Sequence, residues 1–443
     1  MIGSRKNHCR LLLLGMAFFT LGPMPLHAQE EVEKDNQLTI DGQIFTRGEI
    51  RRGGFTSDEE KEAEGKANFV LSRTRLSVDY QRTGIELKVT AQHSGVWGQS
   101  GKGSFNLYEA WAQLRSKQGL FVKVGRQELS YDDERIIGRN DWAVAALSHD
   151  VLRFGYEGHG HKAHAILAYN QNAENTNGGT FYENGAQPYK TMHTLWYHYD
   201  VPRIPLGVSA LLMNIGLQGG EKDASPTTRY QQFFGGYVSY RPKGWSVEGS
   251  YYRQSGVNEE GIDIRAWMAS VKAQVSPRPN YGFVAGYDYL SGDKLFAVPS
   301  KGTIGLTQHS VIRGFNPLYG SHHQFYGAMD FFYVSTYVNG FTPGLQNLYV
   351  GGHYLPMKGL RLSATYHYLA MATQLTEMDR TLGHEIELSA SYAVTKDCNL
   401  SAGYSFMTGT ETMERLKRAS DDSNLRWAWV TLSISPRIFM TRW

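Results

Sequence analysis

The chain has 443 residues, with 27 Tyr, 48 Gly and only 2 Cys, and its formal net charge is +3. A mean hydropathy of −0.41 and the lack of a long apolar segment beyond the N-terminus exclude a helical membrane protein. The small net charge argues against nucleic acid or a charged membrane surface as a partner. Abundant Tyr and Gly are typical of strands, aromatic girdles and tight turns.

The first 28 residues have the pattern of a secretory signal peptide. Three cations (Arg5, Lys6 and Arg10) precede an apolar run over residues 11–21, which is too short to span a bilayer as a helix. Two prolines end the run, and cleavage is expected after Ala28. The alternative, a buried N-terminal helix, would have to begin with three bare cations and end at two prolines. We therefore expect a signal peptide over residues 1–28 and a single domain over residues 29–443.

Side chains alternate with a period of two along the chain that follows. Over residues 73–80, one face of the expected strand carries Thr74, Leu76, Val78 and Tyr80. The other face carries Arg73, Arg75, Ser77 and Asp79. The alternation recurs in residues 85–92, 108–115, 361–368, 385–392 and 430–434. A period of two predicts β-strands, so the domain is expected to be all-β.

The two faces of these strands distinguish a membrane barrel from a soluble sandwich. The apolar face is rich in Tyr and Ala, whereas a packed core favours Leu, Ile and Val of matched volume. The opposite face carries charges of both signs in strand after strand, which is typical of a water-filled lumen. We therefore predict a single transmembrane antiparallel β-barrel of about 18 strands, closed between its first and last strands, with a polar passage inside.

The connections between the expected strands alternate between short and long. Short turns, expected on the periplasmic side, cover residues 82–84, 116–119, 242–244 and 357–359. Long polar connections, expected to be extracellular with some folded inward, cover residues 53–65, 171–189, 218–229, 291–323 and 410–423.

Several short motifs resemble the alginate export family of outer-membrane porins. They are Gly125-Arg126-Gln127-Glu128-Leu129, Arg135-Ile136-Ile137-Gly138, Asp141-Trp142, Phe315-Asn316-Pro317-Leu318-Tyr319, Gly344-Leu345-Gln346-Asn347 and Leu382-Gly383-His384-Glu385. Together with their neighbours they run in the family's order from about residue 38 to residue 439. The resemblance implies an eighteen-stranded barrel that conducts an anionic polysaccharide, or other solutes, through the outer membrane.

Charged residues on the expected inner face are the candidate solute-binding groups. Arginine suits a polyuronate because its planar fork can hold a carboxylate through two parallel hydrogen bonds. The expected pore-lining residues are Arg47, Arg73, Arg75, Lys88, Glu109, Lys123, Arg126, Arg135, Arg153, Arg361 and Glu385. Arg126 and Arg135 lie in the family motifs, where a bulge at Gly125 would change the phase of the alternation. The alternative is that these arginines pair with lumenal acids and only brace the barrel.

We expect an anion preference carried by a group of four arginines with few acids nearby in sequence, namely Arg73, Arg75, Arg126 and Arg135. The expected function is passive diffusion of anionic polysaccharide or other anionic solutes. A general or sugar-selective diffusion porin is the second hypothesis, and a loop-mediated adhesin or structural anchor is the third. The expected protein is a monomer in contact with outer-membrane lipid, with periplasmic export proteins as candidate partners and no nucleic acid.

No catalytic, metal or cofactor site is expected. Residues 132–134 with His149 and Asp150 could form an acid/base or calcium site, but we interpret residues 132–134 as solvated loop charge. The cluster of His159, His161 and His164 lacks a fourth ligand at a suitable spacing. Cys398 is the single cysteine outside the signal peptide, so there is no disulfide framework. An energy-coupled transporter is disfavoured, because no plug domain fits between residue 29 and the first expected strand, residues 38–49.

Overall fold

The structure, a computed structural model, describes residues 35–52, 67–99, 103–176, 180–220, 226–293, 311–330, 342–375, 378–417 and 424–443. The expected signal peptide and the expected connection at residues 53–65 lie outside these ranges. Three other long connections, expected at residues 171–189, 218–229 and 291–323, are described in part, as is the one at residues 410–423.

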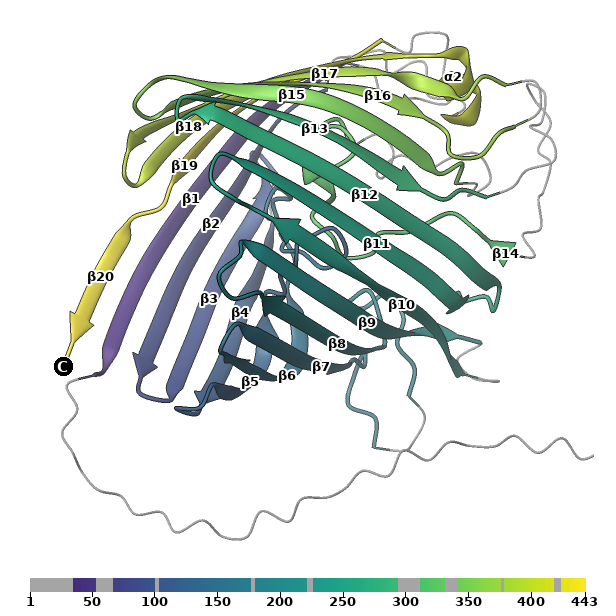
Figure 1. Ribbon diagram of the computed structural model, residues 1–443. Coiled ribbons are helices and arrows are strands. Elements are labelled where there is room, and N and C mark those ends of the chain that lie inside the picture. Colours follow the sequence, from purple (N-terminus) through teal and green to yellow (C-terminus); the bar gives the residue numbers. More distant parts are fainter. Residues whose placement is uncertain are drawn as a thin grey trace, which may run out of the picture. The chain divides into compact units, whose positions relative to one another are not determined.

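Consecutive antiparallel strands follow one another around a closed sheet (Figure 1). The elements are β1 (Gln37–Arg52), β2 (Ala67–Arg82), β3 (Ile85–Val96), β4 (Ser104–Arg115), β5 (Leu120–Gln127), β6 (His149–Gly158), β7 (His161–Tyr169), β8 (Thr191–Asp200), β9 (Leu206–Gly219), β10 (Thr227–Tyr240), β11 (Trp245–Val257), β12 (Asp263–Arg278), β13 (Tyr281–Leu290), β14 (Val311–Ile312), η2 (His322–Gln324), β15 (Leu345–Met357), β16 (Leu360–Ala370), β17 (Thr381–Thr395), β18 (Cys398–Gly409), α2 (Glu411–Lys417), β19 (Asn424–Ile434) and β20 (Arg437–Arg442).

The first and last strands close the sheet. Both β19 and β20 pair with β1, and they form one strand interrupted at Ser435 and Pro436. A proline has no backbone N–H to donate to a ladder, and the register of β1 shifts opposite this point, between Ile40 and Asp41. The short β14 pairs in parallel with β12 and is not part of the wall. Within the described ranges the wall therefore has 18 strands, which confirms the predicted barrel.

Alternate side chains of the wall meet two different environments. On β2, Leu76 is 49% exposed on the outer face, whereas Arg73 is 1% exposed on the inner face. Apolar side chains are exposed in the same way on other strands, for example Val124 on β5 and Leu212 on β9. An outer surface of exposed Leu, Val and Tyr suits bilayer hydrocarbon rather than water. Among the described residues, no helix is long and apolar enough to cross a membrane.

One β-bulge changes a predicted face. The alternation of β4 placed Tyr108 on the apolar outer face, but its side chain points inward and is 2% exposed. The register between β3 and β4 skips Tyr108, since Thr90 pairs with Glu109 and Ala91 pairs with Leu107. An extra residue on one strand turns two successive side chains to the same side. The bulge therefore lies on β4 rather than at Gly125.

Two connections fold into the barrel. They are the β5–β6 loop (residues 128–148) and the segment of residues 313–330, which join through a parallel bridge between Ile137 and Tyr319. Their apolar side chains pack on inward Met and Ile residues of the wall, such as Met213 and Ile215 on β9. The sequence suggested an interior that is polar throughout. In the structure, part of the interior is apolar. An inward loop buries its own apolar residues and needs an apolar partner on the wall.

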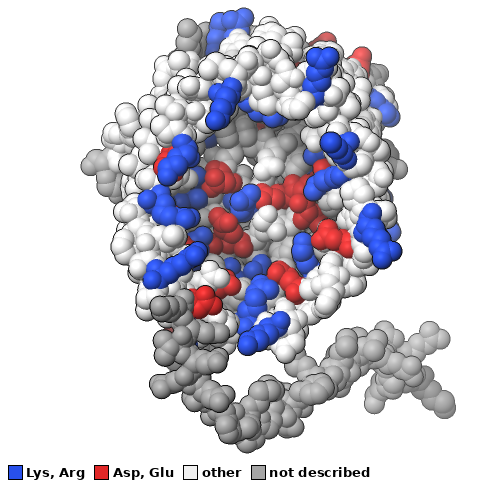
Figure 2. All heavy atoms as spheres, turned by 60° about the vertical axis from the view of Figure 1, so that its left-hand side comes forward, with Lys and Arg blue, Asp and Glu red and all other residues white. Residues whose placement is uncertain are grey.

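Charged side chains gather inside the opening at the end with the short turns. Viewed from the end with the short turns, the barrel is hollow, and Asp and Glu side chains lie within the opening together with Lys and Arg (Figure 2).

Candidate functional site

The β5–β6 loop is held against β1, β2 and β3 by side chains that donate to its backbone. Arg47 Nη1 donates to Trp142 O at 3.0 Å, and Gln92 Nε2 donates to Ala145 O at 2.9 Å. The Arg47 guanidinium also lies over the Trp142 ring, 4.1 Å from its centroid. Because these bonds satisfy loop carbonyls that would otherwise be buried without a partner, they hold the loop inside the barrel.

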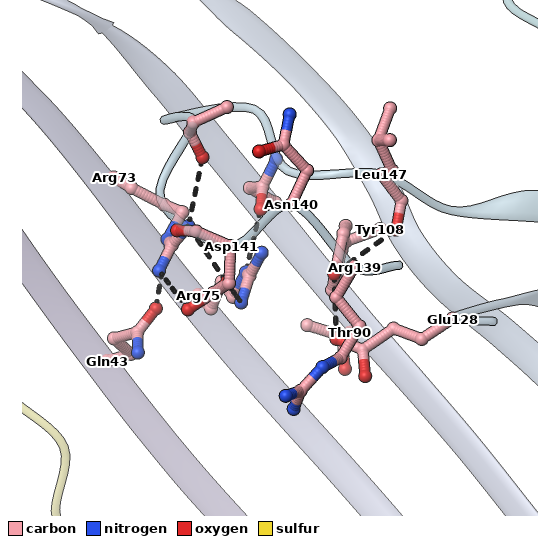
Figure 3. Close-up of polar contacts among 12 residues, drawn as sticks. Gln43, Arg73, Arg75, Thr90, Tyr108, Glu128, Arg139, Asn140, Asp141 and Leu147 are labelled. Atoms are coloured by element: carbon pink, nitrogen blue, oxygen red, sulfur yellow. Dashed lines mark hydrogen bonds and ion pairs between the residues drawn. The ribbon is translucent and has the colours of Figure 1, made fainter. Parts of the chain in front are cut away.

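Arg73 and Arg75 on β2 both point at Asp141 of this loop (Figure 3). Arg73 Nη1 and Arg75 Nη1 each lie 3.1 Å from Asp141 Oδ1. Arg73 Nη1 also donates to the backbone oxygen of Asp141, and Arg73 Nε donates to Gln43 on β1. One carboxylate thus binds two guanidinium groups, so both arginines anchor the loop.

Across the barrel, Asp132 docks the same loop onto β8 and β11. Its carboxylate accepts from Trp196 Nε1 at 3.1 Å and from Tyr252 OH at 3.2 Å. Burial raises the pKa of Asp132, and hydrogen bonds from Ser209, Trp196 and Tyr252 offset part of this rise. These donors are neutral, so the carboxylate is satisfied by dipoles rather than by a cation.

Arg135 of the loop forms a buried ion pair with β13. Its Nη1 lies 3.1 Å from Asp288 Oδ1, and its Nε lies 3.2 Å from Asp133 Oδ2. The hydroxyl of Tyr326 accepts from Arg135 Nη1 at 2.8 Å, and the Phe325 ring covers the guanidinium. Arg135 therefore joins the loop, the wall and the 313–330 segment at one point.

Glu134 joins the two inward connections. Its carboxylate accepts from Ser321 Oγ and Ser130 Oγ at 2.6 Å and from Arg139 Nε at 2.8 Å. Burial alone would raise the pKa of Glu134, but these three donors hold it below its ordinary value. The ionised carboxylate is therefore the form that holds the loop to the segment.

The far end of the 313–330 segment is held by two acids of β17. Glu385 Oε1 accepts from the Met329 backbone N–H at 3.0 Å, and Glu387 Oε1 accepts from that of Ala328. Gly327 makes this approach possible, because a Cβ there would lie 2.3 Å from Glu385 Oε2 and its φ is +96°. Glu385 thus acts on the segment rather than facing the open part of the lumen.

Most of the residues predicted to line the pore lie on the inner face of the wall. They are Arg47, Arg73, Arg75, Lys88, Glu109, Lys123, Arg153, Arg361 and Glu385. Arg135 lies in the inward loop.

Arg126 does not line the pore. It shares the outer face of β5 with Val124, which is 53% exposed, whereas the neighbouring Lys123 and Gln127 are buried on the inner face. Arg126 pairs with Asp150 on the outer face of β6, with Nη2 to Oδ2 at 2.7 Å. The regular alternation of β5 continues through Gly125, so the expected change of phase does not occur.

The arginines that have few acids nearby in sequence form ion pairs with acids in the folded structure. Arg73 and Arg75 share Asp141, and Arg135 meets Asp288, which is 153 positions away in the chain. Residues 132–134 are likewise not solvated loop charge, because all three carboxylates bind groups inside the barrel. No pattern in the sequence assigned these contacts, although Asp141 and Trp142 were already part of the family motif.

Two adjacent inner cations have no acid partner among the described residues. Lys123 on β5 and Arg153 on β6 are directly opposite each other in register. Neither forms an ion pair with a described residue: Lys123 Nζ lies over the Trp111 ring, 3.3 Å from its centroid, and Arg153 Nη1 donates to Tyr131 OH at 3.4 Å. Arg153 Nε is buried without a hydrogen-bond partner among the described residues. This pair is the strongest candidate for holding an anion.

A separate polar cavity of about 500 Å³ lies between the inward connections and β11–β17. It combines acids and bases with aromatic rings, including Asp133, Arg241, Glu248, Lys272, Phe325 and Tyr349. Glu248 accepts from Arg241 Nη2 at 2.9 Å and from Lys272 Nζ at 2.8 Å, so its charge is balanced within the cavity.

Residues 28–425 match the sequence profile of the family described as alginate export. The chain belongs to the alginate export family. No curated protein matches it in sequence.

Solved structures resemble the fold of this alginate export family chain. OccK9 (OpdG) of Pseudomonas aeruginosa has a TM-score of 0.60 at 14% identity, covering 90% of this chain and 98% of its own. A BenF-like porin from Pseudomonas fluorescens Pf-5 has a TM-score of 0.58 at 15% identity, covering 90% and 99%. OccK2 (OpdF) of P. aeruginosa, solved in complex with glucuronate, has a TM-score of 0.59 at 12% identity, covering 91% and 98%. Family and fold together indicate an outer-membrane channel.

The histidines considered as metal ligands in this alginate export family chain have other partners. His164 Nε2 lies 3.1 Å from Glu157 Oε1 and its Nδ1 lies 3.0 Å from Tyr131 OH, whereas His161 Nδ1 lies 2.7 Å from Tyr197 OH. Among the described residues, no group of three or more His, Cys, Asp or Glu is arranged to hold a metal ion.

Proposed function

We propose that this barrel is a passive channel for anionic solutes, up to anionic polysaccharide, and that Lys123 and Arg153 hold the carboxylate in transit. The observation that carries the proposal is this adjacent pair of inner cations with no acid partner among the described residues. The group of four arginines expected from the sequence is tied to acids, so we assign the anion preference to Lys123 and Arg153 instead.

The chemistry of the pair suits a uronate. A carboxylate that enters the barrel loses part of its hydration, and fixed cations compensate for that loss. Arg153 offers a planar donor fork with an unused Nε, and Lys123 adds a point charge from the next strand. A solved neighbour of similar fold, OccK2 (OpdF), was crystallised in complex with glucuronate, which supports a uronate as a candidate solute.

Paired charges beside this site moderate the binding. Lys88 Nζ lies 2.7 Å from Glu109 Oε2, and Arg115 Nη2 lies 3.2 Å from Glu157 Oε2. A polymer unit that leaves Lys123 and Arg153 therefore meets mixed rather than purely cationic surroundings. Conduction requires this, because a site must bind strongly enough to admit a solute and weakly enough to release it.

The test is the reversal potential of the purified barrel in a planar bilayer, with and without oligogalacturonate. We expect the wild type to prefer anions and to be blocked by the oligomer. The variant Lys123→Gln/Arg153→Gln should lose the preference, and its affinity for the oligomer should fall about tenfold, or about 1.4 kcal/mol.

A charge-matched control separates the site from net charge. The variant Arg265→Gln/Arg380→Gln removes two exposed cations next to the long connections and should keep the selectivity and block of the wild type. Lys123→Arg should also keep them, and heat-modifiable gel migration checks folding. A cation-selective wild type, or unchanged selectivity in Lys123→Gln/Arg153→Gln, would contradict the proposal.

The polar cavity of about 500 Å³ favours a second candidate, a sugar-selective porin. Aromatic rings beside balanced charges suit a hydroxyl-rich neutral solute. Liposome swelling with a neutral sugar and a uronate of equal size distinguishes the two functions. Equal entry rates at low salt favour the sugar porin, whereas faster uronate entry favours the anion channel.

We further propose that the channel acts as a monomer, with periplasmic export proteins as its candidate partners. Light scattering of the detergent-solubilised barrel, corrected for bound detergent, tests the oligomeric state. A trimer mass would contradict it.

A further inference from the structure

Two arginines face each other on the outer surface of the wall. Arg52 ends β1 and Arg426 lies near the start of β19, and these two strands lie side by side (Figure 1). The two residues are directly opposite each other in register, and both side chains are exposed. Their strands carry Ile50 and Val430 on the same outer face, 53% and 54% exposed. We call Arg52 and Arg426 the outer pair.

The charges of the outer pair repel each other. Neither guanidinium forms an ion pair with a described residue, and that of Arg426 lies over the Phe406 ring, 5.8 Å from its centroid. The Cβ atoms of directly opposite residues in a sheet are about 5 Å apart, and like charges at such positions destabilise the pairing. An anion bound between Arg52 and Arg426 would remove this repulsion.

Two other arginines of the outer face have acids of the chain as partners. Arg126 Nη2 lies 2.7 Å from Asp150 Oδ2, and Arg265 Nη2 lies 3.5 Å from Asp263 Oδ2. A charge on the lipid-facing surface is costly unless it is paired or reaches the headgroup region. The outer pair differs from these two arginines, since its counter-ion has to come from outside the described part of the chain.

The outer pair lies at one boundary of the apolar band. The outward side chains of β1 from Ile40 to Ile50 carry no charge, and these ten residue steps cover about 34 Å along the strand. At a strand tilt of about 40° they span about 26 Å along the membrane normal, close to the height of about 25 Å of such a band. Because β1 ends and β19 begins at long connections, which face the outside in outer-membrane barrels, Arg52 and Arg426 lie at the headgroups of the outer leaflet.

The side chains around the outer pair are arranged in layers that suit an amphiphile. In the register row on the membrane side lie Tyr404 and Ile50, 41% and 53% exposed on the outer face. In the row on the other side lie His384, Thr408 and Asn424, all exposed. Acyl chains would meet the first row, a phosphate the outer pair, and sugar hydroxyls the imidazole, hydroxyl and amide groups of the second row. This order is that of a phosphorylated glycolipid.

We infer that the outer pair binds the phosphate of a phosphorylated glycolipid in the outer leaflet. The planar fork of arginine holds a phosphate through two parallel hydrogen bonds, and Arg52 and Arg426 supply two such forks from adjacent strands. Cations beside a membrane-spanning segment bind anionic headgroups in the same way. The site lies on the lipid-facing surface, apart from Lys123 and Arg153 on the inner face, so the inference does not depend on which solute the channel passes.

The test measures the binding of bisphosphorylated lipid A to the purified barrel in a neutral detergent, by native mass spectrometry. We expect the wild type to bind it, and to bind dephosphorylated lipid A at least about tenfold more weakly. Arg52→Gln/Arg426→Gln should lower the affinity for bisphosphorylated lipid A about tenfold or more. Arg52→Lys/Arg426→Lys keeps the charge but loses the planar forks, so its affinity should lie between those of the wild type and the Gln variant.

A charge-matched control lies on the same face at the same end of the barrel. Arg253→Gln/Arg265→Gln removes two exposed arginines, of which Arg253 is opposite Trp267 in register rather than opposite a cation. This control should keep the affinity of the wild type within about twofold. An equal loss in the control would show unspecific attraction to cations and overturn the inference. Displacement of lipid A by inorganic phosphate, but not by chloride of the same ionic strength, would assign the site to a free anion and also overturn it.

Thermal stability separates lipid binding from a structural role of the outer pair. In lipid-free detergent, Arg52→Gln/Arg426→Gln should unfold at the wild-type temperature or above it, because the repulsion is gone. Bisphosphorylated lipid A should raise the unfolding temperature of the wild type but not that of the variant, as read from heat-modifiable gel migration. A variant less stable than the wild type without lipid would assign the pair to contacts within the protein and overturn the inference. The reversal potential of the variant should equal that of the wild type, so failure of this inference leaves the proposed function intact.

Discussion

Arg135 of the β5–β6 loop and Asp288 of β13 lie 3.1 Å apart, with side chains 3% and 2% exposed. This ion pair connects the loop to a wall strand far along the chain, with Asp133 and Tyr326 as further partners of the guanidinium. A loop that is held in this way has one position inside the barrel, and the channel that remains open is defined by that position.

Removing the acid of this pair should be costly. Asp288→Asn leaves Arg135 buried with less charge compensation, and the expected loss is about 3–5 kcal/mol of unfolding free energy. Urea unfolding monitored by gel migration measures the change. The double variant Arg135→Met/Asp288→Leu should lose clearly less, because it leaves no buried charge without a partner. A double variant as unstable as Asp288→Asn would show that packing, not charge, sets the cost.

Asp141 should suppress the anion preference by neutralising two arginines. Asp141→Ala leaves Arg73 and Arg75 without their acid, so the anion-to-cation permeability ratio should rise at least about twofold. Reversal potential measures the ratio. Glu128→Gln removes a carboxylate of the same loop that binds Tyr108, and it should have a smaller effect. A shift towards cations in Asp141→Ala would refute this role.

Acid pH should loosen the junction between the two inward connections. The pKa of Glu134 lies below its ordinary value of 4.5, so its ionised form stabilises the junction above that pH. The stabilisation is lost as pH falls through the lowered pKa, because the protonated form cannot accept equally from Ser130, Ser321 and Arg139. Current noise in an open channel should therefore rise as the pH falls below 4.5 and through the lowered pKa of Glu134. Channels with Glu134→Gln should show higher current noise at neutral pH and no further rise at acid pH. A wild type whose current noise stays low as the pH falls would contradict the role of Glu134 at the junction.

Gly125 should be required because of its backbone conformation and the close approach of the neighbouring strand, and not because it forms a bulge. Its φ is +116°, and a Cβ there would lie 2.2 Å from Ala110 O. Gly125→Ala should therefore destabilise the barrel by about 1–3 kcal/mol, read from heat-modifiable migration against temperature. Gly48 on β1 is the matched control, because a Cβ there meets nothing within 4 Å. Equal effects at the two positions would exclude steric strain as the cause.

The wall of the barrel could be predicted from sequence, and the physical reason is local. A strand turns successive side chains to opposite faces, so the alternation of Arg73 and Arg75 with Leu76 and Val78 reports which face meets lipid. The same rule placed Lys123 and Arg153 on the inner face. It failed at Tyr108, because a bulge adds one residue to a single strand without leaving a sign in the alternation.

The arrangement inside the barrel was decided only by tertiary structure. Which cations stay free depends on the path of the β5–β6 loop, and that path is set by contacts between residues far apart in the chain, such as Arg73 with Asp141 and Arg135 with Asp288. The sequence by itself determined that a barrel forms and which charges of its regular strands face inward, with the exception of Arg126. The fold then neutralised Arg73, Arg75 and Asp288 through an inward loop and left Lys123 and Arg153 without an acid among the described residues, because burying a loop requires partners for each of its charges.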